Sequence, residues 1–314
     1  MTTTDASKNN ILPLAIVTGA ARGIGRAAAE LLAHQKAFNI VLVIRDIELG
    51  KDVENEIRKI WSHVYSIPCS DLGSHTEVQK LKKVVQEEKF PKSPLKILVN
   101  CAAECPENQV LRKRLRKPMN GPSSTFEAKA SEVSEELVDA QFSSNVLAYH
   151  FMIKEFVKNQ IICDNTYIVN VASNWAGDVD LDDFNFSRRR YDNDSAYRQS
   201  KACDRMLTKE WSDHFNEQQG KENKLEAQYN IFVNSCHPGD PCTKLSTALG
   251  YNLYASKDCR SSCKSIMYLA TKVDTSGGWY EADGSKQHCG YMSDRYKQER
   301  KKLWEICESF CVSD

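Results

Sequence analysis

A tyrosine and a lysine four residues apart, Tyr197 and Lys201, have the types and spacing best suited to acid–base chemistry. Residues at positions i and i+4 of a helix share one face, so the lysine ammonium can lie beside the tyrosine phenol. A nearby positive charge favours the phenolate and lowers a pKa that is otherwise about 10. The pair therefore predicts a tyrosine that serves as a general acid or base near neutral pH.

The same spacing occurs at Tyr268 and Lys272, so the surrounding sequence has to distinguish the two pairs. The stretch Ile168–Ser173 has the pattern of a buried strand that ends in a serine, and Tyr197 opens the helical pattern that follows it. Tyr268 lies in a late helical pattern among apolar neighbours, where packing explains it better. The first pair is therefore predicted to meet the serine at the sheet edge where ligands bind.

A glycine-rich turn, Thr18–Gly25, follows an apolar strand and precedes an alanine-rich helix. Glycines in this setting permit a tight turn, and they leave amide N–H groups and the helix dipole aimed at a phosphate. The spacing is GxxxGxG and differs from the GxGxxG of the common dinucleotide fingerprint. The succession of strand, turn and helix nevertheless predicts a dinucleotide site.

The residues after the second predicted strand bear on which nicotinamide nucleotide binds. An acidic residue about 20 positions beyond the glycine turn would bind the ribose 2′-hydroxyl of NAD, and Asp46 is the candidate. Arg45 precedes it and Arg22 lies inside the turn, and two guanidiniums suit a 2′-phosphate that arginine grips bidentately. We expect NADP(H) in preference to NAD(H), with use of NADH as the alternative.

Short β-branched runs alternate with helical patterns along the chain. Strands are predicted at Leu14–Thr18, Asn39–Ile44, Val64–Pro68, Leu95–Asn100, Thr166–Ala172, Ile231–Cys236 and near Trp279–Glu281. Helices are predicted at Ile24–Gln35, Ile47–Trp61, Thr76–Glu88, Ser134–Asn159, Ala196–Asn216, Asp258–Ala270 and Asp294–Cys311. This alternation predicts an α/β fold: a Rossmann-type doubly wound parallel sheet of about seven strands, with helices on both faces.

One domain spanning residues 1–314 accounts for this alternation, and three segments depart from it. Residues 1–10 are polar and are predicted to be flexible. Residues 105–131 are predicted to form an insertion loop, in which the basic run Arg112–Lys117 is solvated. Residues 240–262 are predicted to form a loop beside the substrate, because long loops in compact domains are usually functional.

The composition argues against several other classes of protein. Lys+Arg and Asp+Glu both number 42, so a zero net charge gives no electrostatic case for nucleic acid. The apolar run Ile11–Gly19 is too short to span a bilayer, and we expect a cytoplasmic protein without a transmembrane anchor. The 12 cysteines form no CxxC pair, so neither disulfides nor a metal site is predicted.

These motifs together resemble those of the short-chain dehydrogenase/reductase family over nearly the whole chain. The similarity is greatest to the retinol-dehydrogenase-like and WW-domain-oxidoreductase branch, in the stretches Leu181–Phe186, Ser195–Lys201 and His237–Asp240. The resemblance implies an NADP-dependent carbonyl reductase or alcohol dehydrogenase that acts on a small apolar aldehyde, ketone, retinoid or steroid. In that branch an arginine at the position of Arg45 is usual, and assembly as a homodimer would be in keeping with the family.

The resemblance also assigns roles to residues. The catalytic set that it implies is Ser173, Tyr197, Lys201 and Asn145. Tyr197 would donate the proton, Ser173 would hydrogen-bond the carbonyl oxygen, and Lys201 would hold the ribose hydroxyls, while Asn145 would position a water. The cofactor-binding set is Thr18, Gly19, Arg22, Gly23, Ile24, Gly25, Arg45, Asp71, Leu72, Asn100, Ala102, Tyr197, Lys201, Pro238, Gly239 and Thr243.

The sequence departs from the family pattern in a few places. Cys101 and Ala103 stand where the family has asparagine and glycine, and Ala172 replaces a common serine. These changes, with the 105–131 insertion, leave a second class of protein open: a catalytically silent scaffold that senses NADP(H) and binds a protein partner.

Overall fold

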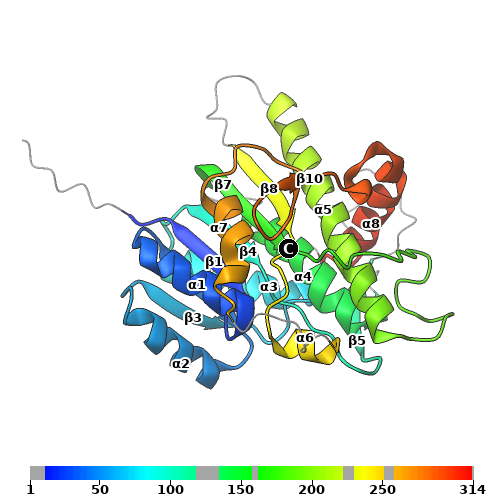
Figure 1. Cartoon of the computed structure of the whole chain (residues 1–314), viewed down its shortest axis with the longest axis horizontal. Coiled ribbons are helices and arrows are strands. Elements are labelled where there is room, and N and C mark those ends of the chain that lie inside the picture. Colours follow the sequence, from blue (N-terminus) through cyan, green and yellow to red (C-terminus); the bar gives the residue numbers. More distant parts are fainter. Residues whose placement is uncertain (1–10, 118–133, 158–161, 222–229, 251–257, 313–314) are drawn as a thin grey trace, which may run out of the picture.

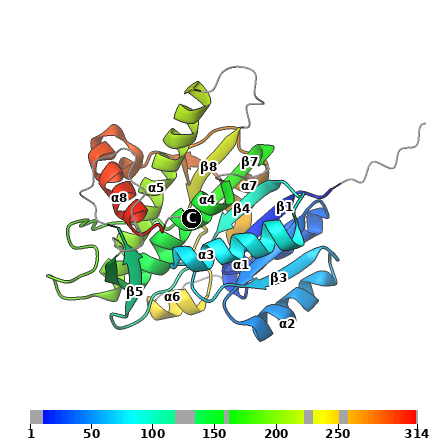
Figure 2. The same ribbon diagram turned by 180° about the vertical axis from the view of Figure 1, so that it is seen from behind.

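A central sheet with helices on both faces forms the body of the protein, as the opposite views in Figures 1 and 2 show. The computed structural model describes residues 11–117, 134–157, 162–221, 230–250 and 258–312, so the N-terminal segment predicted to be flexible lies outside it. The strand order is β10-β9-β8-β7-β4-β1-β2-β3. Its strands are β1 (Leu14–Thr18), β2 (Asn39–Ile44), β3 (Val64–Pro68), β4 (Leu95–Asn100), β7 (Ile162–Val171), β8 (Ile231–Cys236), β9 (Trp279–Tyr280) and β10 (Lys286–Gln287).

All neighbouring strands from β3 to β9 pair in parallel, which confirms the predicted doubly wound α/β sheet. The predicted number of about seven strands is corrected to eight, because β10 adds an antiparallel strand beyond β9. Both β10 residues are exposed and polar, so the sequence carries no hydrophobic signal for this strand. Strand β2, between β1 and the edge strand β3, is buried along its whole length, as expected for a strand covered on both sides.

Eight α-helices are seen in the described residues: α1 (Gly23–Gln35), α2 (Ile47–Arg58), α3 (His75–Lys82), α4 (Ala148–Val157), α5 (Asn193–Lys221), α6 (Lys244–Ala248), α7 (Lys264–Thr271) and α8 (Lys297–Ser309). The buried faces of α1, α2 and α7 share one apolar cluster on one side of the sheet. Helices α3, α4 and α5 cover the other side, where α8 packs against α5 (Figure 2). No helix in these described parts of the chain is both long and apolar enough to cross a bilayer.

A two-stranded antiparallel hairpin stands apart from the main sheet and corrects two predictions. Strand β5 (Leu111–Arg116) lies within the predicted insertion loop, and β6 (Ser134–Asp139) lies where a helix was predicted to start. Residues 118–133 between the strands are outside the described part of the chain. The long predicted helix is replaced by β6, a π-helical segment, Phe142–Leu147, and then α4.

Complementary charges face each other across this hairpin. Lys113 pairs with Glu135, and Arg116 pairs with Glu136, each across the two strands. Such contacts between strands cannot be read from the local periodicity that predicted a helix. The basic run is also not simply solvated, because Arg114 is only 8% exposed and its guanidinium lies 2.8 Å from the Asp71 carboxylate.

Candidate active site

A cavity of about 630 Å³ lies at the carboxyl edge of the sheet and joins the glycine turn to the start of α5. The order of the strands reverses between β1 and β4, and this is the place where doubly wound sheets bind ligands. Tyr197 and Lys201 line the cavity together with Gly19 and Gly25, although more than 170 residues separate the two groups in the sequence. The fold therefore brings the predicted nucleotide turn and the predicted acid–base pair to one site.

The glycine turn is shaped by close backbone contacts. A Cβ atom on Gly19 would lie 2.7 Å from the Cα of Ala102, and one on Gly25 would lie 2.5 Å from the carbonyl oxygen of Gly19. The turn leads into α1, whose N-cap, Arg22, makes no side-chain cap and whose first turn holds no acidic residue. The first N–H groups of α1 are thus available to an anion, which fits the phosphates of a dinucleotide.

Two residues predicted to bind the cofactor lie behind the cavity wall. The Oγ1 of Thr18 accepts hydrogen bonds from the backbone N–H groups of Cys101 and Ala102, at 3.0 and 3.1 Å. This fixes the loop after β4 against the glycine turn. Asn100 is fully buried, and its amide donates to Asn170, 2.9 Å away.

The Asn100 contact is the first link of a buried polar chain. The Asn170 amide donates to Thr208 Oγ1 at 3.0 Å, and Thr208 Oγ1 donates to the carbonyl oxygen of Asp204 at 2.7 Å. The chain crosses from β4 through β7 to α5, the helix that carries Lys201. It therefore ties the loop beside the glycine turn to the helix of the acid–base pair.

A network of charged residues closes the side of the cavity at the end of β2. The Arg45 guanidinium lies 3.5 Å from the Glu104 carboxylate, and Arg112 from β5 contacts both oxygens of the same carboxylate at 2.8 and 3.1 Å. Arg112 also lies 3.8 Å from Asp71. Asp46, the residue that would favour NAD, caps α2 and accepts hydrogen bonds from two backbone N–H groups. All five side chains belong to residues that line the cavity.

The phenol of Tyr197 is buried, and the Ser173 side chain hydrogen-bonds with it. Burial raises the pKa of Tyr197 above its ordinary value, and the Ser173 hydrogen bond opposes this. The direction differs from the expected lowering by Lys201, because burial has the largest effect on this phenol. The Lys201 ammonium donates to the Val171 carbonyl at 3.0 Å and to the Asp204 carboxylate at 2.8 Å, so a negative charge also balances its positive charge.

Asn145 is fully buried and holds the loop after β4. Its Oδ1 accepts from the backbone N–H of Glu104 at 2.9 Å, and its Nδ2 donates to the Glu104 carbonyl at 3.1 Å and to Ser200 Oγ at 3.0 Å. The side chain therefore fixes the base of the charged network and ties it to α5.

The segment after β8 covers the glycine turn. Thr243 caps α6 through a reciprocal pair of hydrogen bonds with Ser246, and its Cγ2 lies 3.3 Å from where a Cβ of Gly23 would be. Helix α6 lies below the carboxyl edge of the sheet in Figure 1. Part of the predicted substrate loop is thus a short helix, and residues 251–257 of that loop are outside the described part of the chain.

Most of the predicted site residues line the cavity. They are Gly19, Arg22, Gly23, Ile24, Gly25, Arg45, Asp71, Leu72, Ala102, Tyr197, Lys201, Pro238 and Thr243. The remaining predicted residues lie beside or behind its wall: Thr18, Asn100, Asn145, Ser173 and Gly239.

Four residues of the site were not predicted from the sequence: Glu104, Arg112, Asp204 and Arg205. Asp204 follows Lys201 by three residues, so helical spacing alone would have placed the two on one face. Arg205 donates to the Ser173 carbonyl at 2.5 Å and stacks on Trp279, a contact that no local pattern indicates. The pairing of Arg112 with Glu104 depends on the hairpin, which the sequence did not predict.

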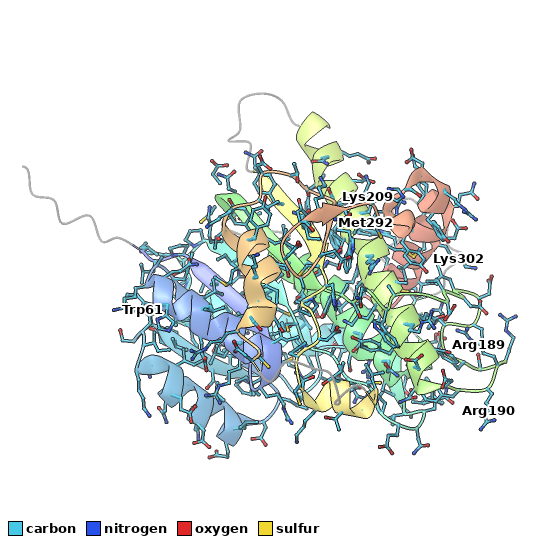
Figure 3. The ribbon with its side chains drawn as sticks, viewed as in Figure 1. Trp61, Arg189, Arg190, Lys209, Met292 and Lys302 are labelled. Carbon is cyan, nitrogen blue, oxygen red and sulfur yellow. The ribbon has the colours of Figure 1, made fainter. Side chains whose placement is uncertain are left out.

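Other candidate groups lie elsewhere. Tyr268 is about one-third exposed on α7 and is not among the residues that line the cavity. Arg189 and Arg190 lie on the loop before α5 (Figure 3), where Arg189 pairs with Asp183. A cluster of His150, Glu308 and Cys311 has the spacing of metal ligands, but Lys154 pairs with the same Glu308 carboxylate and supplies a positive charge there.

Comparison with known proteins agrees with this geometry. Residues 13–252 match the family model of short chain dehydrogenases, and the chain therefore belongs to this family. Its members are oxidoreductases that act on CH–OH groups with a nicotinamide cofactor.

Two curated relatives and one solved structure show how similar this chain is to known members of the family. The chain is 27% identical over 310 residues to human retinol dehydrogenase 13, covering 92% of this chain and 81% of that protein. It is 28% identical over 251 residues to an NAD-dependent glycerol dehydrogenase of Listeria innocua, covering 78% of this chain and 75% of that protein. A short chain dehydrogenase from Burkholderia cenocepacia, solved in complex with NADP, superposes with a TM-score of 0.60 at 19% identity, covering 88% and 99% of the two chains.

Proposed function

We propose that this protein is an NADP(H)-dependent oxidoreductase that interconverts a carbonyl compound and its alcohol. One observation carries the proposal: Tyr197 and Lys201 line the same cavity as the glycine turn, and the Ser173 side chain hydrogen-bonds with the Tyr197 side chain. A nucleotide held by the turn would extend toward the only one of the two Tyr/Lys pairs that lines this cavity.

The chain's own residues would divide the work of carbonyl reduction. Tyr197 would donate a proton to the carbonyl oxygen, and Ser173 would hydrogen-bond the same oxygen and hold it in line. Lys201 has three N–H donors, of which two are used within the protein, so the third is available to a ribose hydroxyl. When bound, the reduced nicotinamide supplies the hydride.

The preference for NADP(H) rests on the charges around the end of β2. Arg22 and Arg45 both line the cavity, and planar guanidiniums bind phosphates bidentately. The carboxylate of Asp46, which would suit a ribose 2′-hydroxyl, is engaged as the cap of α2. The 2′-phosphate of NADP(H) would therefore be bound by Arg22 and Arg45, whereas the 2′-hydroxyl of NAD(H) would gain little from their charges.

The substrate is expected to be a fairly apolar aldehyde or ketone, of the retinoid or steroid kind. Small and apolar side chains are among those that line the cavity, including Cys105, Ala172, Leu245 and Ala248. Such a lining binds a hydrocarbon body, and the acid–base pair then selects the carbonyl group.

Oxidation of NADPH, followed by absorbance against a panel of aldehydes, ketones, retinal and steroid ketones, tests the proposal. Wild-type turnover should be reduced at least about a hundredfold in Tyr197→Phe, as the loss of a general acid predicts. The matched control is Tyr268→Phe, which removes the phenol of the other Tyr/Lys pair and should leave turnover unchanged. Tight NADPH binding without turnover of any carbonyl compound would instead support a silent, NADP(H)-sensing scaffold.

A further inference from the structure

The Lys201 ammonium has a buried acidic partner that the proposed reaction does not use. Asp204 lies one helical turn beyond Lys201 on α5 and is fully buried. Its Oδ2 accepts from the Lys201 ammonium at 2.8 Å, while its Oδ1 is buried and has no hydrogen-bond partner. Burying a carboxylate costs free energy unless the charge is paired. The burial of Asp204 therefore depends on its contact with Lys201.

The pair is held from three directions. Lys201 also donates to the Val171 carbonyl at the end of β7, and the Tyr149 hydroxyl from α4 donates to the same carbonyl at 3.1 Å. The Lys201 ammonium lies 5.0 Å from the centroid of the Tyr149 ring. These contacts leave the ammonium little freedom to move. Lys201 lines the cavity and has one N–H donor left.

We propose that Asp204 is a positioning residue that fixes Lys201 and balances its charge, so that Tyr197 stays protonated and is ready to donate its proton in carbonyl reduction. The proposal rests on the assignment of Tyr197 as the proton donor in the proposed function.

Charge balance is the physical basis. A lone ammonium near a phenol stabilises the phenolate, whereas an ammonium paired with a carboxylate does so much less. Asp204 is accordingly among the groups that raise the pKa of Tyr197, after burial and the Cys105 thiol. A tyrosine that keeps its proton at neutral pH is ready to act as an acid, as reduction requires.

The titratable groups near Asp204 lie on α5, α4 and α8. They are Lys201, Tyr197 and Cys203 on α5, Tyr149 on α4 and Cys307 on α8. Burial raises the pKa of both thiols and both phenols, so these four are neutral at pH 7. Lys201 is therefore the charged partner among the described residues.

The Asp204 carboxyl itself titrates near neutral pH. Burial raises the pKa of its carboxyl to about 7, against the opposing effect of Lys201. Above this pH the carboxylate balances Lys201. Below it the carboxyl is neutral, and the wild-type protein should then resemble a variant without the charge.

The test is the pH profile of kcat and kcat/KM for Asp204→Asn in the full chain, with NADPH and a carbonyl compound that the wild type reduces. The alkaline fall of kcat for reduction should move down by about one pH unit, because Tyr197 loses its proton more readily. For the same reason kcat for alcohol oxidation at pH 8 should rise relative to kcat for reduction. The two profiles should converge below about pH 6, where Asp204 of the wild type is protonated.

Asp213→Asn is the matched control, since Asp213 pairs with Lys209 on the same helix and is not among the residues that line the cavity. Lys209 is labelled in Figure 3. The control variant should leave the profile unchanged. A loss of kcat in Asp204→Asn with an unshifted profile would show a merely structural role and overturn the proposal. If Asp204→Asn does not fold, Asp204→Glu carries the test: it should keep the wild-type alkaline fall, and a downward shift there would also overturn the proposal.

Failure of the proposed function gives a different result. If the wild type binds NADP⁺ but reduces no carbonyl compound, the Tyr197 phenolate can be titrated by ultraviolet absorbance in that complex, with Tyr197→Phe as the blank. A lower pKa of Tyr197 in Asp204→Asn would support the role of Asp204 without any turnover, and an unchanged pKa would overturn it.

Discussion

The guanidinium of Arg112 contacts both carboxylate oxygens of Glu104, at 2.8 and 3.1 Å. Arg112 belongs to the β5–β6 hairpin, whereas Glu104 follows β4 and also lies 3.5 Å from Arg45. The hairpin therefore supplies a cation to the wall of the nucleotide cavity, although it is not part of the main sheet.

Removing that cation should weaken the binding of a nucleotide. In Arg112→Ala, Glu104 would keep its hydrogen bond from Ser144 and its longer contact with Arg45, and the cavity would become more negative. We expect the Kd for NADPH to rise about tenfold, which corresponds to roughly 1.4 kcal/mol. Fluorescence titration measures this, and Lys113→Ala is the control, because Lys113 lies on the same strand but pairs with Glu135. Equal affinity in Arg112→Ala and the wild type would contradict the prediction.

Arg45 should discriminate between the two nicotinamide nucleotides. A guanidinium that grips the 2′-phosphate contributes to NADPH binding and leaves NADH binding untouched. We expect Arg45→Ala to lose about tenfold or more in NADPH affinity and to keep its NADH affinity, since a charge-assisted hydrogen bond contributes roughly 1.5–3 kcal/mol. Arg58→Ala on the neighbouring helix α2 is the control. A parallel loss for both nucleotides would mean that Arg45 does not contact the 2′-phosphate.

Gly25 should not tolerate a side chain. In Gly25→Ala the new Cβ would lie 2.5 Å from the Gly19 carbonyl oxygen, so the turn or α1 would have to move. We expect nucleotide binding to fall beyond detection and the melting temperature to drop. Gly290→Ala provides the comparison, because a Cβ there meets nothing within 4 Å. Normal nucleotide affinity in Gly25→Ala would show that the turn does not approach the phosphates closely.

Asp139 should make the stability of the protein depend on pH. Burial raises the pKa of its carboxyl to about 6, while the backbone N–H groups of Phe142 and Gln141 oppose the shift. Because the pKa is higher in the folded state, folding favours the protonated acid, and stability falls as the pH rises from about 4 to 6. A difference of about 2 pH units corresponds to roughly 3 kcal/mol at most.

The variant Asp139→Asn removes this ionisation and keeps an oxygen acceptor for the two N–H groups. We therefore expect it to be more stable than the wild type at pH 8, with the difference disappearing near pH 4. Urea unfolding at both values measures the change. Asp283→Asn, at an exposed position where hydrogen bonds from Ser285 lower the pKa, should not gain stability relative to the wild type as the pH rises. A pH-independent difference for Asp139→Asn would contradict this explanation.

The central sheet could be predicted because its strands are buried apolar runs between clear turns. β1, β2, β3, β4 and β8 have the predicted bounds. The hairpin could not be predicted in this way, since β5 and β6 are rich in charged residues and pair across a separation of 18 residues or more. Their stability depends on which residues face each other, and that information is absent from local periodicity.

For the site, the sequence predicted which residues gather at the cavity better than how they interact. The Tyr197 and Lys201 pair was placed correctly on one helix at the sheet edge. The sign of the pKa change at Tyr197 was wrong, because it depends on burial and on a carboxylate that balances the lysine. Burial and pairing are properties of the packed structure, whereas residue spacing is a property of the chain.

The chain of hydrogen bonds from Asn100 through Asn170 to Thr208 has an evolutionary consequence. A replacement at one of these positions leaves a buried polar group without its hydrogen-bond partner, which destabilises the fold by about 1–3 kcal/mol. Replacement of both partners by apolar residues of matching shape can be nearly neutral. Such positions cannot drift one at a time. In related sequences Asn100, Asn170 and Thr208 should therefore change together or not at all. Lineages that keep all three keep this link between β4, β7 and α5 behind the cavity.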